Sequence, residues 1–261
     1  MTHHFRHEVK GNNMAERVIL LTAAITPIQS FTGSLRSSQL RLGQYRAALR
    51  FWASVADGLN ARIVVIETTG ADVSELTGSV PLAQRGRTLG LPFAPSVTAI
   101  QNGIGAIEAE ALDEAMSVLA ADGALNTLVA KVTGRLQVRN AVNVLVAHDN
   151  LTFLGRRSLD RQFVDSRFFQ VPVTLWKDYM SGLAREISDP DGRYLEHAIA
   201  YRLIRGEYER KLRVLPFPRR PIVQGVSATT GRRYGGKVSR GLNMPLSWAE
   251  RRIAYVGSKQ V

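Results

Sequence analysis

Cysteine is absent from the 261-residue sequence, which excludes disulfide bonds, thiolate zinc sites and cysteine nucleophiles. Long apolar runs are also missing, and none approaches the roughly 20 residues that a membrane-spanning helix requires. Residues 1–13, MTHHFRHEVKGNN, lack the apolar core of a signal peptide. These absences predict a soluble, cytoplasmic protein.

Acidic residues are scarce relative to basic ones, with 22 Asp+Glu against 34 Lys+Arg and a formal net charge of +12. Such an excess favours a polyanionic partner: nucleic acid, an acidic membrane surface or phosphorylated small molecules. The arginines are concentrated near the C-terminal end, in residues 216–220, 231–240 and 250–252. The net charge therefore describes that region more than the rest of the chain.

The length suits one large domain or a domain with an appendage, and a hydrophobic fraction of 45% supports a sizeable core. Residues 1–15 are polar and are expected to form a disordered leader. Apolar periodicity predicts a single domain over residues 16–212. From residue 213 to residue 261, prolines, glycines and arginines replace this periodicity, which predicts a basic, loop-rich C-terminal extension.

A buried strand, a helix and a second buried strand follow the leader. Arg17–Thr26 and Ala61–Glu67 are continuous apolar runs, and Arg41–Leu59 between them has apolar residues at helical spacing. This order predicts an α/β fold built on a doubly wound, mostly parallel central sheet.

Polar residues follow both of these predicted strands. Ligands collect at the carboxyl ends of the strands in doubly wound sheets, so we expect Thr22–Pro27 and Glu67–Gly70 to lie beside a ligand. The Glu67 carboxylate is suited to accept hydrogen bonds from ribose hydroxyls or a base N–H. Alternatively, it is a solvated acid at a strand end.

The stretch Leu128–Asn140, LVAKVTGRLQVRN, begins as a third strand and then presents Lys131, Thr133, Gly134 and Arg135. Two cations, a hydroxyl and a glycine that permits close backbone approach suit an anionic group such as a phosphate. The alternative is a strand whose polar residues face solvent.

A second candidate phosphate contact is Asn102–Glu108, NGIGAIE, at the start of a predicted helix that continues through Leu119. Gly103 and Gly105 are placed to aim backbone N–H groups at a phosphate. The dinucleotide-binding fingerprint is incomplete, however, because Glu108 occupies the third glycine position.

Two further acidic residues have distinctive surroundings. Asp165 stands between apolar and aromatic residues, so its carboxylate must either be paired or have a raised pKa. Arg167 is its obvious structural partner, and catalytic use is the alternative. Glu196 and His197 lie in the first turns of a helix predicted over residues 192–208, which follows another predicted helix over residues 174–187.

Several segments resemble, in their order and spacing, a group of small bacterial glycosyltransferases encoded for surface polysaccharide or O-antigen assembly. That family pairs an ENSG-like strand end with a GKGYGE-like loop, a KITGRY-like strand and a DSRFF-like segment. The resemblance covers residues 18–230 and implies a GT-A-like nucleotide-sugar domain. The matching segments here are LLTAAITP, RLGQYRAALRFW, ETTG, GIGAIEAEALDEA, KVTGRLQVRN, DSRFF and VQGVSATTG.

The resemblance also implies a donor site. The first two strand ends would hold the nucleoside, the glycine pair would line the sugar or diphosphate, and the third strand would meet the diphosphate. Three positions depart from the family pattern, namely Thr68, Ile104 and Leu136, which leaves donor identity and activity open. The implied donor-binding residues are Thr22, Thr26, Arg41, Glu67, Thr68, Gly70, Gly103, Gly105, Glu108, Lys131, Thr133, Gly134 and Arg135.

Sugar transfer requires removal of a proton from the acceptor hydroxyl. Asp165 and Glu196 are the candidates for this base, and each is alternatively a member of a buried ion pair. Ser166, Arg167 and His197 are expected on the acceptor side.

The charge on the leaving diphosphate must also be neutralised. Many GT-A enzymes use a divalent metal on a DxD motif, but the only DxD here is Asp189–Pro190–Asp191, which we interpret as a turn and helix cap. Lys131 and Arg135 are suited to replace the metal. If a metal is bound, Asp149 and Asp165 are the candidate ligands.

Two other interpretations remain. The basic C-terminal region suits a nucleic-acid-binding protein, and the departures from the family pattern suit an inactive transferase that serves as a scaffold. In a transferase, the same basic region would dock on an anionic inner-membrane surface beside a lipid-linked acceptor.

Overall fold

The computed structural model describes residues 16–26, 37–226 and 233–234. The predicted leader and most of the arginine-rich segments after residue 230 lie outside the described residues. Among the helices in the described ranges, none combines the length and apolarity needed to cross a membrane.

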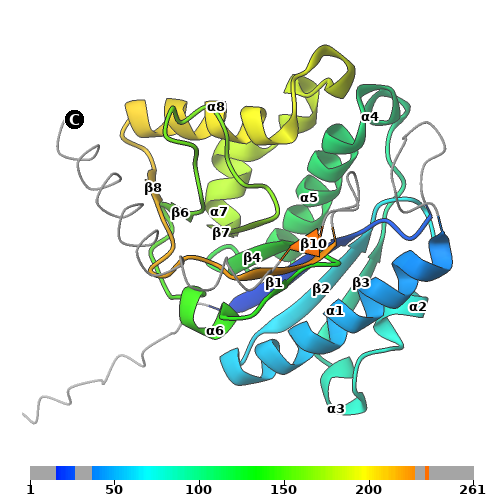
Figure 1. The fold of residues 1–261 in the computed structure, drawn as a ribbon. Coiled ribbons are helices and arrows are strands. Elements are labelled where there is room, and N and C mark those ends of the chain that lie inside the picture. Colours follow the sequence, from blue (N-terminus) through cyan, green and yellow to red (C-terminus); the bar gives the residue numbers. More distant parts are fainter. Residues whose placement is uncertain (1–15, 27–36, 227–232, 235–261) are drawn as a thin grey trace, which may run out of the picture.

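The described strands of the central sheet form the order β3-β2-β1-β4-β7-β6-β8. All pairings in it are parallel except those of β7, which runs antiparallel to both β4 and β6. The predicted α/β fold with a mostly parallel sheet is therefore confirmed (Figure 1). The strands are β1 (Arg17–Ala23), β2 (Arg62–Glu67), β3 (Thr88–Pro92), β4 (Leu128–Thr133), β6 (Thr152–Leu154), β7 (Phe168–Pro172) and β8 (Arg213–Leu215).

A second, small sheet has the order β10-β9-β5, formed by β5 (Gln137–Val138), β9 (Val223–Val226) and β10 (Arg233–Tyr234). Because β5 follows β4 directly, this sheet brings the C-terminal part of the chain beside the carboxyl end of β4. Strand β8 joins the edge of the central sheet, so the region beyond residue 212 contributes to both sheets.

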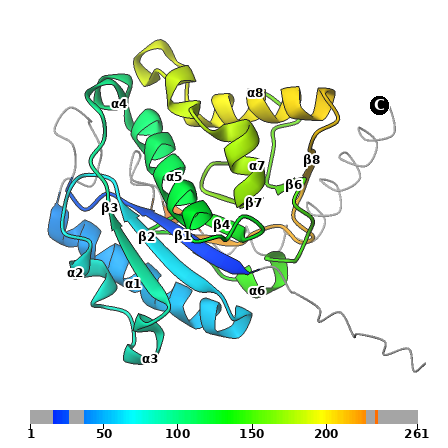
Figure 2. The ribbon, with the colours of Figure 1, turned by 180° about the vertical axis from the view of Figure 1, so that it is seen from behind.

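Helices cover both faces of the central sheet (Figures 1 and 2). On one side α1 (Ser38–Leu59) contributes Trp52 to the core, and on the other side α5 (Ile104–Ala121) and α8 (Leu195–Tyr208) pack in a cluster that contains Trp176. The remaining helices are short: α2 (Ser74–Thr77), α3 (Leu82–Arg85), α4 (Val97–Asn102), α6 (Ala141–Val144), α7 (Val173–Leu175), the π-helical η1 (Trp176–Met180), and the 3₁₀ turns η2 (Leu183–Glu186) and η3 (Asp189–Asp191).

The sequence explains the limits of α1. The Ser37 hydroxyl caps its start by accepting a hydrogen bond from the Leu40 N–H at 3.3 Å. Asn60 ends it in the left-handed conformation, with a φ of 51°. Between these caps, a buried face that includes Tyr45 and Trp52 packs on the sheet.

Residues 174–187 are largely helical, as predicted, but they do not form one regular helix, because the segment is divided into α7, η1 and η2. Asp113 on α5 accounts for the interruption. Its carboxylate accepts hydrogen bonds from the Trp176 indole N–H at 2.7 Å and from the Gly182 N–H at 2.8 Å. Gly182 has a φ of 76°, a conformation that glycine adopts without strain and that ends a helix.

Candidate functional site

The candidate site lies where β1 and β4 end. From β1 the chain continues through β2 to β3 on one side, whereas β4 is added on the other side, so the order of the sheet reverses between β1 and β4. The carboxyl ends of strands at such a switch point form the usual ligand-binding crevice of an open α/β sheet.

Gly134 joins the ends of these two strands. Its N–H donates to the Thr22 carbonyl oxygen at 2.9 Å, and an added Cβ would lie 2.7 Å from that oxygen. The sequence predicts that Gly134 permits close approach of a ligand, but in the structure it is the backbone of β1 that approaches Gly134 closely.

Arg135, the next residue, carries the least satisfied charge in this region. It is only 6% exposed, yet its Nε and NH1 atoms have no hydrogen-bond partner among the described residues. Its guanidinium lies 5.5 Å from the centre of the Tyr45 ring. Burial lowers the pKa of Arg135, and the nearby charge of Arg41 adds to this effect. A buried cation with unused donors is suited to bind an anion.

Arg41 and Tyr45 hold the loop after β1. The Arg41 Nε donates to the Ala24 carbonyl at 2.6 Å, and the Ala24 N–H donates to the Tyr45 hydroxyl at 2.9 Å. Both side chains are buried beside Arg135. The sequence predicts a helix over Arg41–Leu59 with apolar residues at helical spacing, but nothing in that spacing indicates that the Tyr45 ring lies under a cation.

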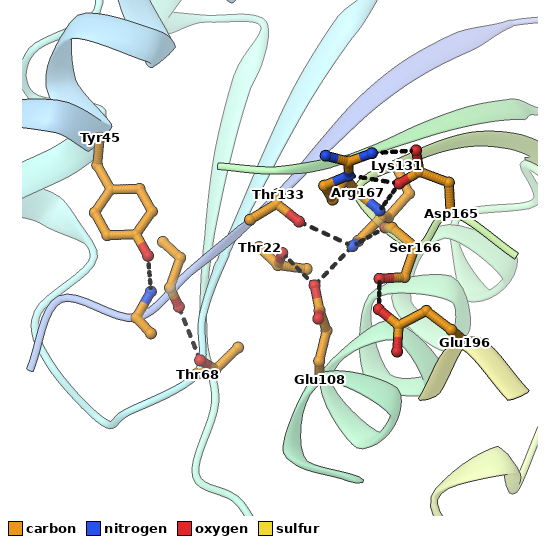
Figure 3. A network of polar contacts seen from close by, with 12 residues as sticks. Thr22, Tyr45, Thr68, Glu108, Lys131, Thr133, Asp165, Ser166, Arg167 and Glu196 are labelled. Atoms are coloured by element: carbon orange, nitrogen blue, oxygen red, sulfur yellow. Dashed lines mark hydrogen bonds and ion pairs between the residues drawn. The ribbon is translucent and has the colours of Figure 1, made fainter. Parts of the chain in front are cut away.

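Lys131 is fully buried and already has three acceptors (Figure 3). Its Nζ lies 2.7 Å from Glu108 Oε1 and 2.5 Å from the Ser166 carbonyl oxygen, with Thr133 Oγ1 at 3.4 Å. The Thr22 hydroxyl donates to the same Glu108 oxygen at 2.7 Å. Lys131 and Glu108 thus link β1, β4 and α5 to each other, and neither presents a free charge of the kind expected for direct diphosphate contact.

Glu67 is likewise occupied, although it lies at the predicted edge. Its Oε1 accepts from the Ile25 N–H and the Thr69 hydroxyl, and its Oε2 accepts from the Thr69 and Ala71 N–H groups, all at 2.6–2.8 Å. The carboxylate is fully buried. Glu67 therefore holds the segments that follow β1 and β2 against each other, whereas the sequence predicted that it contacts the nucleoside.

The neighbouring residues of this loop serve the same purpose. The Thr68 hydroxyl donates to the Ala23 carbonyl at 2.9 Å, and the Thr26 N–H donates to the Thr69 hydroxyl at 3.3 Å. Gly70 turns the chain with a φ of 76°.

The N-terminus of α5 does not offer the expected phosphate site. The Gly105 N–H donates to Asp189 Oδ2 at 3.0 Å, and a Cβ on Gly103 would lie 2.4 Å from the same oxygen. The interpretation of the DxD as a helix cap therefore holds for Asp189, but the helix it caps is α5, which precedes it by 84 residues.

Asp165 is paired with arginines. Arg167 binds it with two hydrogen bonds, Nε to Oδ1 at 2.7 Å and NH2 to Oδ2 at 2.6 Å, and Arg156 NH1 lies 3.5 Å from Oδ2. Burial opposes ionisation of Asp165, but the Arg167 hydrogen bonds and the charges of both arginines outweigh it and lower the pKa of the carboxyl. The Tyr234 ring stacks on the Arg167 guanidinium at 4.8 Å. The ion-pair alternative therefore describes Asp165 better than the catalytic one.

The lowered pKa of Asp165 predicts acid sensitivity. A depressed carboxyl pKa adds stability that is complete above the unfolded value, about 3.9, and is lost as the pH falls through the folded value. We expect Asp165→Asn to lower the unfolding free energy by about 2 kcal/mol at pH 7. Between about pH 5 and pH 3, the variant should lose less stability than the wild type does. Urea unfolding at several pH values measures this, and Arg167→Met should flatten the profile similarly. Parallel profiles for wild type and both variants would count against the pair.

Glu196 has a different environment from Asp165. The Ser166 hydroxyl donates to Glu196 Oε1 at 2.5 Å, and the Ser166 carbonyl is one of the Lys131 acceptors. Among the described residues, Glu196 forms no ion pair, and its carboxylate has the Ser166 hydroxyl as its partner. The adjacent His197 is exposed, and its ring contacts Phe163 and Tyr194.

No family model matches the sequence, and no curated protein matches it. Among solved structures, the galactosyltransferase LgtC in complex with donor and acceptor sugar analogues is similar, with a TM-score of 0.50 and 9% identity over 76% of this chain and 72% of that chain. A second similar structure is that of a protein from Desulfovibrio desulfuricans G20 described as a nucleotide-diphospho-sugar transferase. Its TM-score is 0.43, with 17% identity over 78% of this chain and 80% of that chain. The fold is GT-A-like. At 9% identity, the similarity to the galactosyltransferase concerns the fold alone.

A divalent metal, which many GT-A proteins hold, does not fit the residues at this site. The end of β4 carries Lys131 and Arg135 where a metal needs oxygen ligands, and both oxygens of Asp165 face arginines. The described residues include no group of three or more His, Asp or Glu side chains placed to hold a metal.

Asp149, the other predicted metal ligand, lies away from the site. Asp149 precedes β6, which runs in the same direction as β4. It therefore lies at the amino ends of these strands, whereas the candidate site lies at the carboxyl ends. Its carboxylate accepts from the Thr152 hydroxyl at 2.7 Å and pairs with Arg213. These contacts connect the starts of β6 and β8.

Proposed function

We propose that the chain is a glycosyltransferase that moves a sugar from a nucleotide-sugar donor to a glycan or lipid-linked acceptor in bacterial surface polysaccharide synthesis. The observation that carries the proposal is the buried, incompletely hydrogen-bonded Arg135 guanidinium at the switch point of a GT-A-like sheet. The similar galactosyltransferase structure, which contains donor and acceptor sugar analogues, supports it.

Arg135 is suited to the donor diphosphate because a planar guanidinium binds two phosphate oxygens at once. Its Nε and NH1 donors, on different edges of the guanidinium, have no partner among the described residues, so each can donate to an anionic oxygen without breaking a contact there. The charge of Arg41 nearby makes the region more attractive to an anion. In this proposal Arg135, with the charge of Arg41 nearby, stabilises the leaving diphosphate, and a metal is not required.

Glu196 is the better candidate for the base that takes the proton from the acceptor hydroxyl. Its partner is a neutral hydroxyl, Ser166, whereas Asp165 is held as a carboxylate by Arg167 and Arg156. Lys131 acts as a positioning residue, because it holds the Ser166 backbone at 2.5 Å.

The test is thermal unfolding of the wild-type protein with UDP-, GDP-, CMP- and dTDP-sugars, each with EDTA or with Mg²⁺. We expect one nucleotide class to stabilise the protein by about 2–3 kcal/mol at a hundredfold excess over its Kd, equally in EDTA. Glu196→Gln should keep this stabilisation and lose transfer of labelled sugar. If no nucleotide sugar stabilises the protein, the proposal is wrong, and stabilisation only with Mg²⁺ would contradict its metal-free form.

The inactive scaffold is a second candidate, and the pairing of Asp165 favours it, since this residue was one of the two candidates for the base predicted from the sequence. A scaffold would bind a nucleotide sugar but would not transfer or hydrolyse it, so the two measurements above separate the candidates. The nucleic-acid alternative and membrane docking depend on basic segments that lie mostly outside the described residues.

A further inference from the structure

Helix α8, yellow at the top of Figure 1, presents a stripe of exposed aromatic residues. Tyr194, Tyr201 and Tyr208 are 45%, 62% and 87% exposed. His197 and Ile204 lie between them, also exposed, and complete a repeat of three and four residues along one face of the helix. Exposed apolar surface of this extent marks an interaction site more often than isolated exposed residues do.

The stripe itself carries no carboxylate or guanidinium. The charged side chains of α8 lie beside it and have partners: Glu196 bonds to Ser166, Arg202 to Glu186, Arg205 to Glu209, and Glu207 to Arg157. An aromatic surface without carboxylate or guanidinium groups is suited to an uncharged ligand.

The stripe begins at the candidate site. Tyr194 precedes the first turn of α8, whose Glu196 is bonded to Ser166 at 2.5 Å. The Tyr194 and Phe163 rings lie 5.6 Å and 5.9 Å from the His197 ring, which extends the aromatic surface toward the Ser166 segment. From there the stripe leads away along α8.

We propose that this stripe, Tyr194–His197–Tyr201–Ile204–Tyr208, holds a neutral oligosaccharide acceptor whose reacting end lies beside Glu196. The proposal rests on the proposed function. Faces of sugar rings rich in C–H groups pack on aromatic rings, and tyrosine hydroxyls bond to sugar hydroxyls. Successive tyrosines are seven residues apart in sequence, hence about 10 Å along the helix axis, a spacing comparable to one disaccharide unit of an extended glycan.

Two other occupants suit the stripe less well. A second copy of the helix would need branched aliphatic residues at these heptad positions, and among the five only Ile204 is one. An anionic bilayer is recognised by basic side chains, whereas Arg202 and Arg205 of α8 are each paired with a glutamate.

The test is affinity electrophoresis of the full chain toward the cathode in native gels that contain dextran, laminarin, galactomannan or hydroxyethylcellulose. We expect at least one neutral glycan to retard the wild type. Tyr201→Ala/Tyr208→Ala should bind that glycan roughly tenfold more weakly or worse, whereas Tyr201→Phe/Tyr208→Phe keeps the rings and the retardation. Leu82→Ala is the matched control, since Leu82 is 79% exposed on α3, across the sheet from α8.

The proposal is overturned if none of the four glycans retards the wild type, or if the double alanine variant is retarded equally. It is also overturned if the alanine changes instead abolish sedimentation with phosphatidylglycerol vesicles or a dimer in analytical ultracentrifugation. Nucleotide-sugar stabilisation of the same variants is measured in parallel. Its absence in the wild type refutes the proposed function, and its presence without glycan retardation refutes the acceptor stripe alone.

Discussion

Replacing Arg135 with methionine is expected to stabilise the protein and abolish donor binding. Removal of a buried cation whose Nε and NH1 are unsatisfied should raise the unfolding free energy by about 1–2 kcal/mol, after the lost contact with Tyr45 is offset. The same change removes the proposed bonds to the diphosphate, so nucleotide-sugar affinity should fall roughly 10- to 100-fold. Thermal unfolding with and without the stabilising nucleotide sugar measures both effects.

Arg139→Met is the matched control for this experiment. Arg139 also lies over an aromatic ring, that of Phe51 at 5.8 Å, and follows the same strand, but its side chain is exposed. Its replacement should neither stabilise the fold nor change donor affinity. If Arg135→Met destabilises the protein and leaves donor affinity intact, Arg135 is a packing residue and the anion site is wrong.

The opposite signs of the two effects distinguish a binding residue from a structural one. A cation kept buried without partners costs stability in the free protein, and that cost is recovered when an anion binds. A residue retained for packing alone would lower the stability when it is removed.

The sequence predicts the beginning of the fold well, for a physical reason. Arg17–Thr26 and Ala61–Glu67 are apolar over most of their length because both faces of the sheet are covered by helices, and this pattern is local. The order of the later strands depends on pairings between distant segments, such as β4 with β7 and β6 with β8, which no local pattern specifies.

That these polar residues lie together was also predictable, because polar residues that follow parallel apolar strands lie at the carboxyl ends of those strands. The roles of individual side chains were not, since each depends on partners far along the chain. Asp189 reaches Gly105 across 84 positions, and Thr22 reaches Glu108 across 86. Likewise, the pattern around Asp165 allowed pairing or catalysis, and the distances to Arg167 and Arg156 favour pairing.

Lys131 is expected to matter first for stability. Lys131→Met removes the partner of Glu108 and a donor to the Ser166 carbonyl inside the protein, which should cost about 2–4 kcal/mol of unfolding free energy. The double variant Lys131→Met/Glu108→Gln should recover at least half of this loss, because no unpaired carboxylate remains. Urea unfolding of the wild type, both single variants and the double variant gives the coupling free energy.

The control for that cycle is the solvent-exposed i,i+4 pair Arg205–Glu209 at the C-terminal end of α8. Its removal should leave the unfolding midpoint unchanged. Donor affinity of the refolded double variant then separates two roles for Lys131. If Lys131 only positions its neighbours, affinity should remain within a few-fold of wild type, in contrast to Arg135→Met. A loss as large as that of Arg135→Met would show that Lys131 leaves Glu108 for the diphosphate when the donor binds, and both cations would then belong to the leaving-group site.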